Sequence, residues 1–117
     1  MTRSKTETVK QRTTLTIVVV GGPEAMLHAA HRVAPSIASA RVVGANVEEV
    51  ATVVAAHRPF AILVSADVIA LDPSEFEALS RDVGATLVPV ETHGLTPIQI
   101  CDAITAKLMD ALNARLS

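Results

Sequence analysis

Aromatic side chains are nearly absent from this sequence of 117 residues, which contains no tryptophan, no tyrosine and only two phenylalanines, Phe60 and Phe76. Single-stranded nucleic acids are bound by stacking bases on exposed aromatic rings, and this chain has almost none to offer. The formal charge is -2, from 10 basic and 12 acidic residues, so no overall positive field attracts a phosphate backbone or an anionic membrane. We therefore expect neither nucleic acid nor membrane as a partner.

Cysteine and long hydrophobic runs are also scarce. The single cysteine, Cys101, cannot form an intramolecular disulfide bond. The first residues are not followed by an uninterrupted apolar segment like that of a signal peptide, and no apolar run approaches the roughly 20 residues that cross a bilayer. These absences predict a cytoplasmic protein.

Aliphatic side chains, by contrast, are abundant. Half of the residues are hydrophobic, which excludes intrinsic disorder for most of the chain. The length fits one compact domain, since two domains would each be too small to bury a useful core. Residues 1–13 differ from the rest because they are polar and carry, against Glu7 alone, the basic residues Arg3, Lys5, Lys10 and Arg12. We predict a flexible basic tail over residues 1–13 and one domain over residues 14–117.

Short apolar runs divide the domain into strands. Runs of strand length, rich in β-branched residues, predict strands at residues 15–20, 40–44, 60–64 and 85–90. Pro89 removes a backbone donor from the last run, which predicts an edge position for that strand.

Helix start signals lie between these runs. Capping boxes at Asn46/Glu49 and Thr96/Gln99, and an N-cap followed by proline at Asp72-Pro73, predict the starts of three helices. Helices are expected over about residues 23–34, 46–57 and 73–83, and from residue 97 toward the C-terminus. The buried stripe of the second helix is predicted to consist of Val47, Val50, Ala51 and Val54.

Strands that alternate with helices and are hydrophobic throughout predict a parallel sheet covered on both faces. The expected fold is therefore α/β, a three-layer α/β/α sandwich. Such folds place their sites at the carboxyl ends of the strands. The candidate residues there are Gly21, Gly22, Ser65, Asp67, Glu91, Thr92 and His93.

The stretch from Val42 to Val64, VVGANVEEVATVVAAHRPFAILV, resembles the second strand, second helix and third strand of two-component response-regulator receiver (CheY-like) domains. The helix-ending His57-Arg58-Pro59 before an apolar strand is its most specific part, and residues 97–104 are similar to the last receiver helix. The resemblance covers about residues 14–112 and implies a flavodoxin/CheY-like parallel sheet. The family has five strands, so we expect a shortened sheet of four or five: either the fifth strand and its preceding helix are missing, or the deletion lies earlier.

The same resemblance implies a degenerate phosphorylation site. Receivers hold Mg²⁺ with an acidic pair after the first strand, and Gly21-Gly22 stand at those positions, from which no hard-cation site can be made. Ser65 occupies the phosphoacceptor position, where a hydroxyl neither binds the ion by charge nor attacks without a base. Thr92 and His93 fall at the positions of the switch hydroxyl and the lysine. We expect no enzyme activity, no metal and no cofactor.

Three functional hypotheses follow. The first is a non-catalytic pseudo-receiver that binds another protein, or itself, as an adaptor in bacterial-type signal transduction. The second is a small-ligand or nucleotide-binding domain, or a weak enzyme, that uses the Gly21-Gly22 turn and the strand ends at Ser65 and His93. The third is a homo-oligomeric structural subunit, joined through the last helix or the last strand's free edge.

Other side-chain groupings have simpler explanations. Ser65, Asp67 and His93 contain a nucleophile, a carboxylate and a base, but no G-x-S-x-G elbow surrounds the serine. Two explanations are considered for His28, His31 and His57: that they ligate zinc, or that they are solvated residues on helix surfaces. The second explanation is preferred. Cys101 is interpreted as a small core residue.

Overall fold

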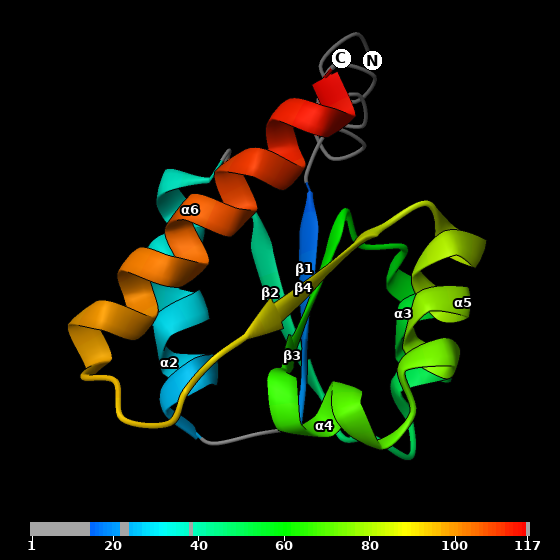
Figure 1. The fold of residues 1–117 in the computed structure, drawn as a ribbon. Coiled ribbons are helices and arrows are strands. Elements are labelled where there is room, and N and C mark those ends of the chain that lie inside the picture. The colour runs from blue at the N-terminus through cyan, green and yellow to red at the C-terminus, as the bar shows by residue number, and fades with distance from the viewer. Residues whose placement is uncertain (1–14, 22–23, 38, 117) are drawn as a thin grey trace, which may run out of the picture.

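The computed structural model describes residues 15–21, 24–37 and 39–116, so the predicted basic tail and Gly22 lie outside the described residues. Its centre is a sheet of four strands, β1 (Thr16–Val20), β2 (Arg41–Ala45), β3 (Ala61–Ser65) and β4 (Thr86–Val90) (Figure 1). Every neighbouring pair is parallel, and the order across the sheet is β2-β1-β3-β4. The four strands fall within one residue or so of the predicted runs.

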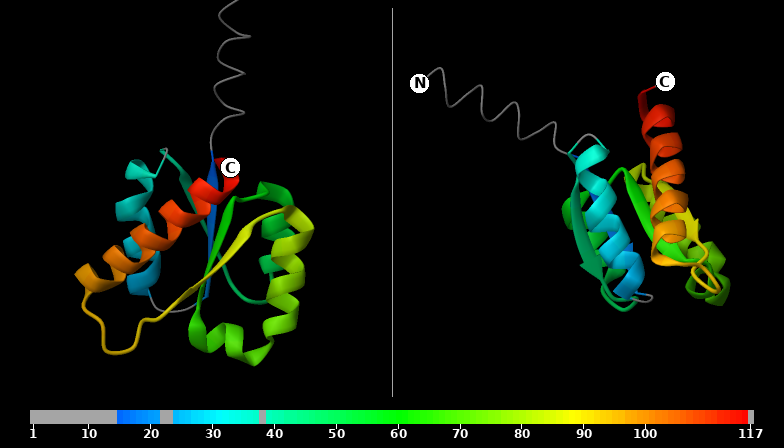
Figure 2. Two further views of the ribbon diagram at one scale, coloured as in Figure 1. Left: turned by 45° about the horizontal axis from the view of Figure 1, so that its top comes forward. Right: turned by 90° about the vertical axis from the view of Figure 1, so that its left-hand side faces the viewer.

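Helices cover both faces of the sheet, as expected for a three-layer α/β/α sandwich. The helical segments are α2 (Glu24–Val33), the 3₁₀ turn η1 (Ala34–Ser36), α3 (Val50–His57), α4 (Ala66–Leu71), α5 (Pro73–Val83) and α6 (Pro97–Leu116). On one face α2 and α6 lie side by side, and α3 and α5 lie on the other (Figures 1 and 2). The fold is thus of the flavodoxin/CheY-like type.

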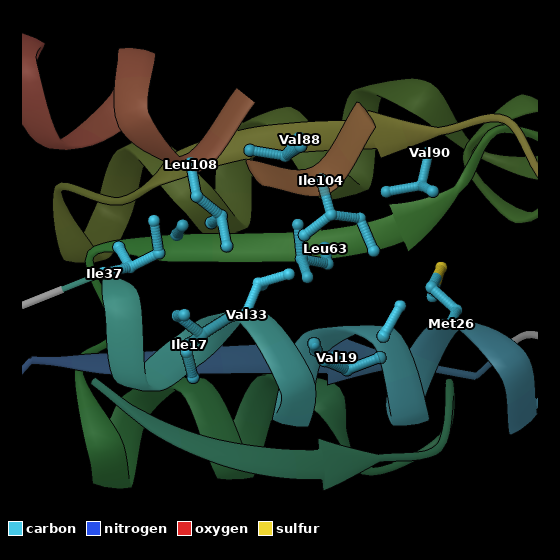
Figure 3. Packing of buried hydrophobic residues seen from close by; sticks show 14 of the residues in the cluster. Ile17, Val19, Met26, Val33, Ile37, Leu63, Val88, Val90, Ile104 and Leu108 are labelled. Carbon is cyan, nitrogen blue, oxygen red and sulfur yellow. The ribbon is translucent and has the colours of Figure 1, made fainter. Parts of the chain in front are cut away.

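Two aliphatic cores hold the layers together. Alternate residues of β1 and β3 face opposite helix pairs: Ile17 and Leu63 face α2 and α6, whereas Val18 and Ile62 face α3 and α5. Figure 3 shows Ile104 and Leu108 of α6 directed toward the sheet where Leu63 lies. Because both faces are covered, β1 and β3 are buried along their whole length, which explains their uninterrupted apolar sequences.

The edge position predicted for β4 is confirmed. Thr86 N–H donates to the Phe60 carbonyl (2.9 Å), and backbone groups along a strand point alternately to its two sides. Pro89, three residues on, therefore directs its ring nitrogen to the free edge. The proline costs β4 no hydrogen bond to β3, and it removes a donor from the edge that another chain could pair with.

The sheet is shorter than the common doubly wound order 2-1-3-4-5. β4 lies beside β3 in the fourth position, and among the described residues no strand lies in the fifth. α6 follows β4 directly and packs against α2. The sheet is thus the shortened, four-strand sheet expected from the sequence, and this strand order is the same for either of the two deletions considered.

Two local expectations are wrong. The helix predicted from Asn46 begins at Val50, because residues 46–49 form a turn closed by the capping box. Val47 is therefore out of phase with the helix and 47% exposed, and Ala51 is exposed too, whereas Val50 and Val54 are buried as predicted. The short helix α4 was not predicted at all.

Candidate functional site

The carboxyl edge of the sheet begins with the turn at Gly21. This residue has a φ of 51°, a left-handed conformation that favours glycine. Its N–H donates to the Ala45 carbonyl (2.8 Å), which joins the end of β1 to the end of β2. The backbone therefore explains this glycine without a bound ligand.

The cavity beside Gly21 has an acidic lining. It measures about 300 Å³, and its walls include Glu24 of α2 and Glu49 before α3. The Glu49 carboxylate also accepts the Asn46 N–H (3.4 Å) in the capping box. A phosphate in this cavity would face two carboxylates and no basic residue, which disfavours the phosphate cradle considered for Gly21-Gly22.

Ser65 is the last residue of β3 and the N-cap of α4. Its Oγ accepts a hydrogen bond from the Val68 N–H (3.4 Å), and the residue is buried. The hydroxyl thus satisfies a backbone donor that the first turn of a helix leaves free. The side chain at the position expected for a phosphoacceptor caps α4.

Asp67 and His93 form an ion pair at the same edge. Asp67 lies in the first turn of α4 and His93 in the segment after β4, and the pair joins His93 Nε2 to Asp67 Oδ2. The hydrogen bond to Asp67 and the charge of Asp67 raise the pKa of His93. Desolvation lowers this pKa to a lesser extent, and the charge of Glu91 makes the smallest contribution, which raises it. Both side chains are exposed, so the surrounding water screens the pair.

The three residues considered as a catalytic triad are only partly brought together. The structure pairs His93 with Asp67, while the hydrogen bond of Ser65 goes to Val68. In a serine triad one imidazole nitrogen faces the carboxylate and the other faces the hydroxyl. Here the serine is committed to a helix cap, and this arrangement does not activate it. Thr92, next to His93, is half-buried.

The remaining histidines and the cysteine lie elsewhere. His28 and His31 are exposed on α2, and His57 is exposed at the end of α3. Among the described residues, no three His, Cys, Asp or Glu side chains are grouped so that they could hold a metal ion. Cys101 is half-buried against the core, as predicted for a small apolar residue, and it borders a groove of about 420 Å³ between α2 and α6.

Sequence reasoning missed one surface near this edge. Leu71, at the end of α4, is 82% exposed, and it lies with the half-exposed Val47 beside a small cleft. One signal was present in the sequence: Ser65 with Asp67 two residues later is a typical helix start. A helix that begins there is followed by the Asp72 cap of α5, so it ends at Leu71.

No helix in the described part of the chain combines the length and hydrophobicity needed to span a membrane. Comparisons of the chain with protein-family models, with curated proteins and with solved structures gave no match.

Proposed function

We propose that this chain is a non-catalytic, receiver-like module that acts by binding another protein in bacterial-type signal transduction. The observation that carries the proposal is the role of Ser65. The residue at the end of β3, where a receiver presents its phosphoacceptor, uses its hydroxyl to cap α4. A two-component receiver scaffold without a phosphoacceptor can still present its surface to a partner.

The surrounding carboxylates support this proposal. Phosphoryl transfer to an aspartate requires a divalent cation that neutralises charge on the phosphoryl group, and Mg²⁺ prefers several oxygen ligands in octahedral geometry. Asp67 is paired with His93, and Gly21, directly after β1, offers no side-chain oxygen. The free cysteine, Cys101, is compatible with a cytoplasmic setting.

Incubation with acetyl phosphate and Mg²⁺, followed by intact-mass analysis, tests the proposal. We expect no phosphoryl adduct. A Ser65→Asp variant is the matched comparison, because it restores a carboxylate at the phosphoacceptor position without restoring the acidic pair after β1. It should also remain unmodified. A stable acyl phosphate on Asp67 or Asp72 of the unaltered chain would identify an active receiver and contradict the proposal.

Self-association is the second candidate, and α6 favours it. Ile98 is 73% exposed and Met109 is 40% exposed on this helix, which is the longest of the molecule's described helices. Pro89 makes the free edge of β4 a poorer contact for a second copy. Light scattering over a range of concentrations tests this candidate, and Ile98→Asp should dissociate any dimer that α6 forms.

A further inference from the structure

The groove between α2 and α6 is larger than the cavity beside Gly21 and the cleft beside Leu71. The two helices lie side by side on one face of the sheet (Figure 2), and the groove between them measures about 420 Å³. Its lining comes from residues 25–33 of α2 and residues 97–101 of α6, and we call it the α2/α6 groove. Small-molecule sites typically measure roughly 300–1,000 Å³, so this groove has the size of a ligand site.

Apolar side chains make up most of the lining. Ala29 and Val33 are buried in the groove, Cys101 is half-buried, and Ile98 is 73% exposed. Ala25 and Ala29 each carry only a methyl group, so the space between α2 and the first turn of α6 stays unfilled. An apolar ligand that covers Ile98 would remove hydrocarbon surface from water, which favours binding.

The charged groups of the lining are all basic. His28 and Arg32 are exposed and lie four residues apart, on the same side of α2. Neither forms a hydrogen bond or an ion pair within the described part of the chain. No aspartate or glutamate is among the lining residues, whereas the cavity beside Gly21 is lined by Glu24 and Glu49. The α2/α6 groove is therefore suited to a ligand with one anionic group and an apolar body.

We propose that the α2/α6 groove binds a small carboxylic acid with an apolar body. The planar guanidinium of Arg32 matches a carboxylate in shape and can donate two parallel hydrogen bonds to it. The imidazole of His28 supplies a further N–H donor. The apolar body then covers Ile98 and Cys101. This inference stands on the size, lining and charge of the groove, and it depends neither on the receiver resemblance nor on the function proposed above.

Alkylation of Cys101 tests the proposal, because this is the only cysteine of the chain and it borders the groove. The rate of its modification by iodoacetamide is followed by intact mass, with and without octanoate. Octanoate at about ten times its Kd occupies roughly nine tenths of the sites, so alkylation should slow about tenfold. Acetate lacks the apolar body and should not protect, and octanol lacks the charge and should protect less than octanoate.

Two pairs of variants provide matched controls. Ala25→Phe fills the groove and should abolish protection by octanoate, whereas Ala51→Phe, the same change at the second residue of α3, should not. Arg32→Gln should raise the octanoate concentration needed for protection roughly tenfold, because a charge-assisted hydrogen bond is lost. Arg81→Gln removes the same charge from the last turn of α5 and should leave protection unchanged.

Methyl NMR spectra recorded during the octanoate titration locate the ligand. We expect saturable shifts at Ile98 and Val33 and none at Leu71, which lies at the end of α4. Three results would overturn the proposal. The first is a lack of protection by octanoate, and the second is stronger protection by octyl phosphate, which would assign the groove to phosphate esters. The third is protection that grows with protein concentration without octanoate, which would show that a second copy of the chain covers the groove.

Discussion

Single residues determine what the carboxyl edge of the sheet can do. The Ser65 hydroxyl accepts a hydrogen bond from the backbone of α4, and the Asp67 carboxylate pairs with His93. Gly21 is explained by its positive φ and by the hydrogen bond from its N–H to Ala45. Each of these residues therefore has a partner within the fold.

Gly21→Ala should lower the free energy of unfolding by about 1 kcal/mol, because a residue with a Cβ is strained in the left-handed region. Steric crowding is not the cause, since the added Cβ would lie 3.5 Å from Val47 Cγ2, an ordinary contact. Urea denaturation measures the difference. Gly44→Ala is the control: its φ is not positive and its Cβ would contact Leu27 at 3.7 Å, so it should be neutral or slightly stabilising. Equal losses from both substitutions would contradict this explanation.

Asp67→Asn should return the pKa of His93 toward its ordinary value of 6.5, because the hydrogen bond and charge of Asp67 are the main causes of the increase. Glu91→Gln should lower this pKa by less. Since the folded-state pKa is raised, the pair stabilises the fold fully below the unfolded-state pKa, and this contribution is lost as pH rises through the folded-state pKa. NMR titration of the His93 ring measures the midpoint. An unchanged midpoint in Asp67→Asn would show that the pair does not form in solution.

At the scale of helices and strands, local signals predicted most of the fold. Both capping boxes are confirmed: Glu49 N–H donates to Asn46 Oδ1 (2.9 Å), and Gln99 N–H donates to Thr96 Oγ1 (3.2 Å). Such interactions join residues three apart, so sequence alone reveals them. The helix α4 was missed because its six residues are too few to show a helical period. The exposure of Leu71 and Val47 went unpredicted with it.

Asp72→Ala should lower the free energy of unfolding by about 1 kcal/mol, the usual cost of removing an N-cap side chain. In the structure the Asp72 carboxylate accepts the Glu75 N–H (3.3 Å) at the start of α5. Asp72→Ser retains an acceptor at the cap and should lose much less. Chemical denaturation of both variants checks this. Equal stability of the alanine and serine variants would mean that the cap contributes nothing.

At the scale of the whole molecule, topology brings together residues that local patterns cannot pair. Alternation of strands and helices predicted that residues following β3 and β4 would share an edge, and they do. The ion pair between Asp67 and His93, 26 residues apart, depends on the backbone paths after both strands, which no local pattern specifies. The aliphatic composition has a simple explanation at this scale, because strands buried on both faces of a parallel sheet are rich in Val, Ile and Leu, and each of the two cores takes in one phenylalanine.

We propose that the carboxyl edge of this flavodoxin/CheY-like fold does not support phosphoryl transfer. Titration of the full chain with Mg²⁺, followed by amide NMR spectra, tests it most directly, because a bound cation is needed before phosphoryl transfer. We predict no saturable shifts at Gly21, Ser65 or Asp67, with or without acetyl phosphate. Saturable shifts that converge on these three residues would show that a working cation site exists at this edge and would contradict the claim.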